Sequence, residues 1–172
     1  MFDKARAVRR SESAARDFVP SGFGRAPLDL RLLCQTKSIE IVDRQLDDEL
    51  SGMALIDEGR RFVVVNSRHH IHRQRFTIAH EIAHHALHSD YLRANIHVDK
   101  SVLRRDPLSS EGVEIREIEA NAFAAELLMP RHLMGSFADL DLADDRAIRV
   151  VAKQFGVSQA AFTYRLMNLG FL

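Results

Sequence analysis

The segment His80-Glu81-Ile82-Ala83-His84 carries two histidines four residues apart, with a glutamate directly after the first. In an α-helix, residues i and i+4 lie on one face, so both imidazoles can bind the same metal ion. Glu81 lies about 100° further around the helix axis, so it does not join the two histidines as a ligand. This spacing predicts a metal site beside which Glu81 accepts a proton from a water molecule.

A catalytic zinc site takes three protein ligands and keeps a fourth position open, so a third ligand must be found. Asp90 is one alternative, because it lies six residues after His84, where some zinc proteases place their third ligand. That arrangement needs a glycine that turns the chain back towards the metal, and Leu87 stands at this position instead.

The helix expected over residues 113–129 offers three more carboxylates, at Glu114, Glu117 and Glu119. Glu117 is favoured, because Asn121 lies four residues later on the same helical face and can hydrogen-bond a ligating side chain. Glu119 lies about 200° around the helix from Glu117, so the two are not expected to face the metal together. Spacing therefore ranks Glu117 above Glu119 without excluding the second.

The chain has nine histidines, and seven of them fall between residues 69 and 88. His88 lies four residues after His84, where it can hydrogen-bond a metal-binding side chain on the side that does not face the metal. His85 is expected on the surface, and the histidines at 69, 70 and 72 are expected in a solvated loop before the helix.

The apolar spacing predicts the elements that must position these side chains, in an α+β fold in which a small antiparallel three-stranded sheet packs on a mainly helical domain. Strands are expected at 38–42, 53–56 and 62–65, with a hairpin turn at Asp57-Glu58-Gly59-Arg60. A long polar connection is expected over 89–112, which contains Asp106-Pro107 and Ser109-Ser110. Helices are expected at 4–18, 28–36, 73–88, 113–129 with a stop at Pro130, 131–138, 142–155 and 159–168.

The composition excludes several classes of protein. Lys and Arg total 24 and Asp and Glu total 24, so no net field attracts nucleic acid or an anionic membrane. Cys34 is the single cysteine, which excludes an internal disulfide and a cysteine-based zinc finger. No apolar run approaches the roughly 18 residues of a membrane span, and no signal peptide is seen, so a cytoplasmic protein is expected.

The C-terminal helices have the spacing of a helix-turn-helix unit over residues 147–166. A DNA-reading helix carries several basic side chains, whereas the segment 159–168 offers only Arg165. A packed helical pair is therefore favoured. The expected organisation is an N-terminal helix and linker over 1–27, a core over 28–138 and this helical pair over 139–172.

Residues 73–88 resemble the active-site helix of the ImmA/IrrE family of metallo-endopeptidases, and residues 117–130 resemble the second signature of that family. The hairpin and the C-terminal tail are also similar, so the resemblance covers about residues 28–172. It implies a zincin-like domain in its compact, peptidase-only form. One departure is Ala83, where relatives often have glycine.

The resemblance implies that His80, His84 and Glu117 bind Zn²⁺, or another divalent ion such as Mn²⁺, and that Glu81 is the general base. Family members are bacterial or phage proteins that cleave or inactivate helix-turn-helix repressors encoded beside them. The implied partner is therefore such a repressor, whose cleavage derepresses stress, DNA-damage or mobile-element genes, and direct DNA binding is not expected.

Two points stay open at this stage. The group that stabilises an oxyanion is not singled out among Tyr91, His97, His132, Tyr164 and the basic residues near the site. The alternative function is a non-catalytic regulator that binds a repressor or DNA. The presence of Glu81 favours the peptidase, because binding alone does not need that carboxylate.

Overall fold

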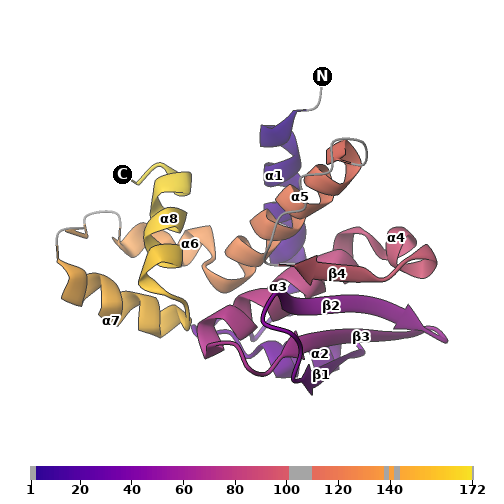
Figure 1. The fold of residues 1–172 in the computed structure, drawn as a ribbon. Helices are drawn as coiled ribbons and strands as arrows, with labels where there is room; N and C mark the ends of the chain where they lie inside the picture. Colours follow the sequence, from indigo (N-terminus) through magenta and orange to yellow (C-terminus); the bar gives the residue numbers. More distant parts are fainter. Residues whose placement is uncertain (1–2, 101–109, 138–139, 142–143, 172) are drawn as a thin grey trace.

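The fold is described from a computed structural model, which describes residues 3–100, 110–137, 140–141 and 144–171 (Figure 1). These residues form an α+β structure in which one mixed sheet packs against helices. The α-helices of the described part are α1 (Lys4–Phe18), α2 (Leu30–Thr36), α3 (Ile71–Leu87), α4 (Ser89–Ala94), α5 (Ser110–Leu128), α6 (Arg131–Met134), α7 (Asp145–Phe155) and α8 (Gln159–Leu169), with a 3₁₀ turn at Gly135–Phe137.

The sheet has four strands in the order β1-β3-β2-β4, so the prediction of a three-stranded antiparallel sheet is wrong in both number and direction. The predicted hairpin is confirmed, because β2 (Leu50–Asp57) and β3 (Arg60–Asn66) pair antiparallel across a turn with positive φ at Glu58 and Gly59. However, β1 (Ile39–Arg44) pairs parallel with β3. The chain leaves β1, passes the end of β3 and enters β2 on the far side.

A buried amide at the end of β3 holds this crossover in place. The Nδ2 atom of Asn66 donates to the carbonyl oxygens of Asp47 (3.1 Å) and Leu50 (2.8 Å), and its Oδ1 atom accepts from the backbone N–H of Leu46 (3.2 Å). The side chain of Asn66 therefore satisfies several backbone polar groups of the loop between β1 and β2.

The segment expected to be a long polar connection contains two ordered elements. The short helix α4 follows α3 directly, and β4 (His97–Lys100) pairs antiparallel with β2 at the edge of the sheet. A four-residue strand that carries His, Asp and Lys lacks the apolar alternation by which a strand is recognised, so the sequence did not reveal it. The turn signals expected at 106–107 and 109 lie outside the described residues.

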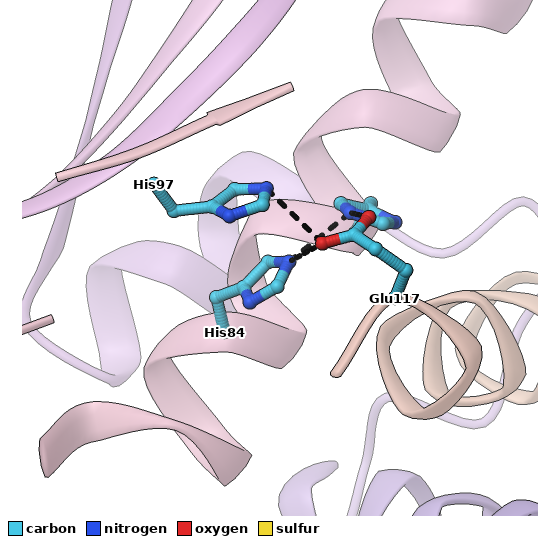
Figure 2. Close-up of side chains that lie close together, drawn as sticks. His84, His97 and Glu117 are labelled. Atoms are coloured by element: carbon cyan, nitrogen blue, oxygen red, sulfur yellow. Dashed lines mark hydrogen bonds and ion pairs between the residues drawn. The ribbon is translucent and has the colours of Figure 1, made fainter. Parts of the chain in front are cut away.

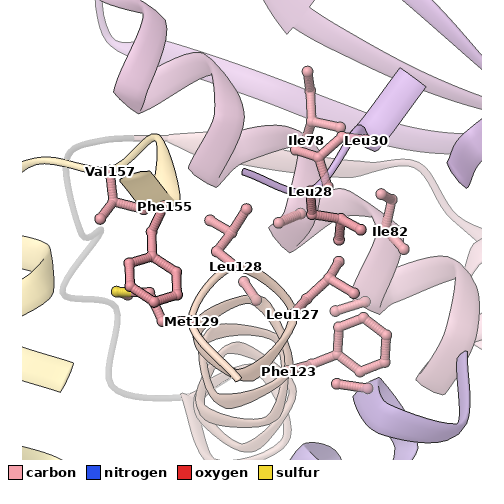
Figure 3. Close-up of a cluster of buried hydrophobic side chains, with 14 of the residues drawn as sticks. Leu28, Leu30, Ile78, Ile82, Phe123, Leu127, Leu128, Met129, Phe155 and Val157 are labelled. Carbon is pink, nitrogen blue, oxygen red and sulfur yellow. The ribbon is translucent and has the colours of Figure 1, made fainter. Parts of the chain in front are cut away.

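Helix α3 is enclosed on two sides, since it packs against β2 and β3 on one side and α5 on the other. Its residues from Thr77 to His85 are all buried. Ile78 and Ile82 of α3 belong to the same buried apolar cluster as Phe123 and Leu127 of α5 (Figure 3). The central helix is thus fixed by packing along most of its length.

Gly52 allows the close approach of β2 to α3. A Cβ atom at this position would lie 2.5 Å from Cγ2 of Thr77, 2.7 Å from the carbonyl oxygen of Val64 and 3.6 Å from Cγ of Glu81. Only glycine fits between the strand and the helix at this distance.

The remaining helices are joined to this centre by buried polar contacts. Arg165 of α8 is buried, forms an ion pair with Glu126 of α5, and contacts Glu12 of α1 at 2.7 Å. Arg75 of α3 donates to the carbonyl oxygens of Leu28 (3.0 Å) and Gly156 (3.1 Å). Within the described residues, no helix has the length and apolar character that crossing a membrane requires.

Candidate metal centre

Helix α3 places His80, Glu81 and His84 on its buried middle section. The Nε2 atoms of His80 and His84 lie 3.1 Å apart, as the i, i+4 spacing predicts for two imidazoles that point to one place. Glu81 extends from the adjacent side of the helix towards β2, where Gly52 leaves room for it.

Helix α5 brings Glu117 to these two imidazoles. Its Oε2 atom lies 3.2 Å from Nε2 of His80, and its Oε1 atom lies 3.7 Å from Nε2 of His84. In a tetrahedral zinc site with bonds of about 2.0–2.1 Å, neighbouring ligand atoms are about 3.3–3.4 Å apart. These three side chains therefore have the separations that one metal ion requires.

A fourth side chain, His97 of β4, also reaches the cluster (Figure 2). Its ring stacks on that of His84, with centroids 3.7 Å apart and an angle of 24° between the planes. Its Nε2 atom lies 3.7 Å from Oε1 of Glu117. From the sequence, His97 was considered only as one of several oxyanion-stabilising alternatives, because the strand that carries it was missed.

Hydrogen bonds behind the two α3 histidines fix their tautomers. Nδ1 of His80 lies 3.1 Å from Oδ1 of Asn121, an oxygen that can only accept, so Nδ1 carries a proton and Nε2 is the nitrogen available to a metal ion. Glu119 accepts from Nε2 of His88 (3.0 Å), so Nδ1 of His88 accepts in turn from Nδ1 of His84 (3.1 Å). Both Nε2 lone pairs are therefore directed at the cluster.

The donor set consequently fits a divalent metal ion. Two imidazole nitrogens and a carboxylate converge on one place, where a divalent cation would replace the proton that His80 shares with Glu117. Histidine nitrogen and carboxylate oxygen are also the ligands that zinc takes in catalytic sites.

Burial and neighbouring charged groups shift the pKa values of His84, His80 and Glu117. Burial lowers the pKa of His84, and the neighbouring His80 and His97 lower it further. Burial also opposes charge on His80, but contact with Glu117 outweighs it and raises the pKa of His80 to about 9. Burial alone would raise the pKa of Glu117, whereas the hydrogen bond with His80 lowers it.

Glu81 is fully buried, and neither of its carboxyl oxygens has a hydrogen-bond partner in the described part of the protein. Burial raises the pKa of Glu81 well above its usual value, although His80 opposes this shift. A carboxyl group in these surroundings takes up a proton more readily than an exposed one.

Other predicted side chains lie elsewhere. Asp90 pairs with Arg93 and is 94% exposed, and Glu114 pairs with Lys4 of α1 at the surface. The expectation that His85 lies at the surface is wrong, because its Nε2 atom donates to the carbonyl oxygen of Phe62 (2.9 Å) in a buried position.

The remaining oxyanion alternatives do not join the cluster. Tyr91 stacks against the guanidinium of Arg116, at 4.1 Å from the ring centroid. Tyr164 is exposed on α8. His132 lies on α6, among residues that line a separate cavity with the 15–28 segment.

A cavity of about 530 Å³ lies next to the cluster, between α1, α3, α5 and α8. Two of its lining residues, Phe76 and Asn121, also flank His80. The rest of the lining is mostly apolar and includes Ile118 and Met129.

Comparison with known proteins identifies a matching family. The family model described as the IrrE N-terminal-like domain, a peptidase family, matches residues 34–167. The Uncharacterized immunity region protein 2 of Bacillus phage phi105 is 30% identical over 112 residues, which make up 64% of this chain and 65% of the phage protein. The Radiation response metalloprotease IrrE of Deinococcus radiodurans is 32% identical over 112 residues, which make up 64% of this chain and 32% of that protein.

A solved structure described as a Mycobacterium tuberculosis transcriptional regulator shares the fold. It superposes with a TM-score of 0.58 at 23% identity, over 91% of this chain and 46% of that one. The chain thus spans less than two thirds of the length of each of these three proteins.

Proposed function

Because the chain belongs to the ImmA/IrrE family of metallopeptidases, we propose that it is a zinc-dependent endopeptidase that hydrolyses a peptide bond in a helix-turn-helix repressor. The observation that carries this proposal is the convergence of His80, His84 and Glu117, with the buried carboxyl group of Glu81 beside them. In this proposal the three convergent side chains bind the ion.

The bound ion would supply a Lewis acid that polarises the scissile carbonyl group and makes a water molecule more acidic. Glu81 accepts the proton from that water molecule, and the water oxygen forms a bond to the carbonyl carbon. Glu81 then delivers the proton to the peptide nitrogen as the C–N bond breaks. The burial that raises the pKa of Glu81 favours its uptake of the proton from water.

Other side chains orient the groups that take part in this reaction. Asn121 holds His80, and His88 with Glu119 holds His84, so that each ligand nitrogen is presented in the correct tautomer. The cavity lined by Phe76 and Asn121 lies on the side of His80 away from the other donors, and it could receive an apolar side chain of a protein substrate.

The names of two relatives support a role in gene regulation. One is an immunity region protein of a phage, and the other is a radiation response metalloprotease. A peptidase that removes a repressor would act in either setting by releasing the genes that the repressor holds silent.

The test uses the purified zinc-loaded protein and the helix-turn-helix regulator encoded beside it, followed on gels and by mass spectrometry. We expect discrete fragments that disappear when a chelator is added. Glu81→Gln should retain zinc in elemental analysis but lower the cleavage rate at least about a hundredfold, since a general base contributes 10²–10⁴-fold.

Glu114→Gln is the matched control, because Glu114 is an exposed carboxylate on the helix that carries Glu117. It should cut at the wild-type rate. Undiminished cleavage by Glu81→Gln would show that Glu81 is not the general base. Intact regulator together with a shift of DNA by this chain alone would favour a non-catalytic regulator instead.

A further inference from the structure

We propose that His97 is a fourth protein donor of the metal centre, and that substrate gains access when this imidazole withdraws. The proposal deepens the proposed function, since it concerns the same ion. Its structural basis is the edge strand β4, which faces the donors of α3 and α5.

Distances support His97 as a donor. The ligand atoms of His80, His84, His97 and Glu117 all lie within 4.8 Å of one another. Nε2 of His97 is 3.7 Å from Oε1 of Glu117, the same separation that joins His84 to this oxygen. A tetrahedral site needs about 3.3–3.4 Å between donors, so the distance between His97 and Glu117 must shorten by a few tenths of an ångström. The ring of His97 must also turn out of its stacked contact with His84.

The surroundings of Nε2 of His97 also support its role as a metal donor. Its Nε2 atom is buried and has no hydrogen-bond partner in the part of the chain that the structure describes. The nearest oxygen of Glu81 lies 4.0 Å away, beyond hydrogen-bond distance. A buried nitrogen without a partner is costly, and a metal ion at the cluster would satisfy it.

A fourth protein donor would occupy the position that water or substrate needs on the metal ion. Zinc sites with four protein ligands are closed, whereas catalytic sites keep one position for water or substrate. If His97 occupies the fourth position at rest, it must leave that position, or share an expanded coordination shell, before a peptide can react.

The position of His97 permits such a change. It is the first residue of a four-residue strand at the edge of the sheet, and within the described residues this strand pairs with β2 alone. The other donors lie on long helices that are packed in the core. A shift of β4 therefore removes one donor and leaves three in place.

The experiment measures metal binding and not cleavage. Wild type and His97→Ala are loaded with Co²⁺, whose visible absorption depends on coordination number, and Zn²⁺ affinity is measured by competition with a chelator. We expect His97→Ala to weaken Zn²⁺ binding by more than the 10–100-fold that loss of an outer hydrogen-bonding partner costs. The Co²⁺ spectrum should change as a solvent molecule replaces the imidazole.

Val98→Ala is the matched control, because Val98 is the next residue of β4 and is exposed. It should leave affinity and spectrum as in wild type. A second measurement needs no variant: ¹⁵N NMR of histidine-labelled wild type should show the His97 Nε2 resonance displaced by Zn²⁺.

Two outcomes overturn the proposal. One is an unchanged affinity and spectrum in His97→Ala, and the other is a His97 Nε2 resonance that Zn²⁺ leaves in place. If His97→Ala then loses cleavage alone, His97 acts on the substrate and not on the metal. A protein that binds Co²⁺ through His97 but cleaves nothing would uphold this proposal and contradict the proposed function.

Discussion

At the scale of single residues, the metal centre depends on atoms that do not face the ion. Asn121 and the His88–Glu119 pair each occupy the rear nitrogen of one imidazole, which leaves the front nitrogen free to coordinate. Without such a partner, a neutral imidazole can exchange its proton between the two nitrogens and rotate.

Substitution of these partners should therefore weaken metal binding. We expect Asn121→Ala and Glu119→Ala each to lower Zn²⁺ affinity about 10–100-fold, measured by chelator competition. Glu114→Gln is the control on the same helix, because its carboxylate pairs with Lys4 at the surface. Equal affinities in all three variants would show that the hydrogen bonds do not orient the ligands.

The residue scale is also where sequence reasoning was most informative. The spacing of His80 and His84 and the pairing of Glu117 with Asn121 could be derived from helical geometry alone, and the structure brings all four together. His97 could not be found in this way. Its contact with the cluster depends on the pairing of β4 with β2, which no local pattern encodes.

At the scale of elements, the contact between β2 and α3 sets the position of the general base proposed here. The strand and the helix approach closely because Gly52 has no side chain, and Glu81 lies within van der Waals range of that position. The sheet therefore supports the reactive part of the helix directly.

Gly52→Ala should separate the two elements. The added Cβ atom would meet Thr77 and a backbone oxygen closer than 3.0 Å, and overpacking of this kind costs about 1–3 kcal/mol of stability. We expect lower stability in urea unfolding and a loss of cleavage in samples that remain folded, because α3 carries Glu81 and two of the donors.

Gly135→Ala is the control for this substitution. Gly135 has helical backbone angles and no atom within 4 Å of an added Cβ, so the change should be tolerated. If Gly52→Ala were as stable and active as Gly135→Ala, the close contact would have no part in positioning the base.

Some helices and strands could be predicted from the sequence, whereas one strand pairing was missed. Residues 73–88 and 113–129 were recognised as helices because apolar side chains recur at helical spacing, and the 57–60 turn revealed its hairpin. The parallel pairing of β1 with β3 was missed, because the crossover is held by hydrogen bonds from Asn66 and not by a turn motif.

At the scale of the whole molecule, a buried ionic cluster joins the two ends of the chain to the central helices. Arg165 of α8 contacts Glu12 of α1 and Glu126 of α5, and Arg16 also pairs with Glu126. Removal of one partner from a buried pair leaves an uncompensated charge, which is more costly than the loss of a surface pair.

We expect Arg165→Ala to lower the free energy of unfolding by about 3–5 kcal/mol, measured by urea denaturation. Arg31→Ala is the control, since Arg31 pairs with Asp43 at the surface and its loss should cost at most about 1 kcal/mol. Similar losses in the two variants would mean that the buried cluster does not hold the helices together.

The proposed metal donors come from three separate elements, α3, β4 and α5, which bring them together only in the folded chain. An ion at this place would act as a cross-link that the unfolded polypeptide cannot form, so binding and folding are thermodynamically linked. At an ion concentration a thousand times the dissociation constant, the linkage would stabilise the fold by about 4.1 kcal/mol. Scarcity of the metal would then lower the amount of folded protein as well as its reactivity, which makes the abundance of this protein responsive to the metal supply of the cell.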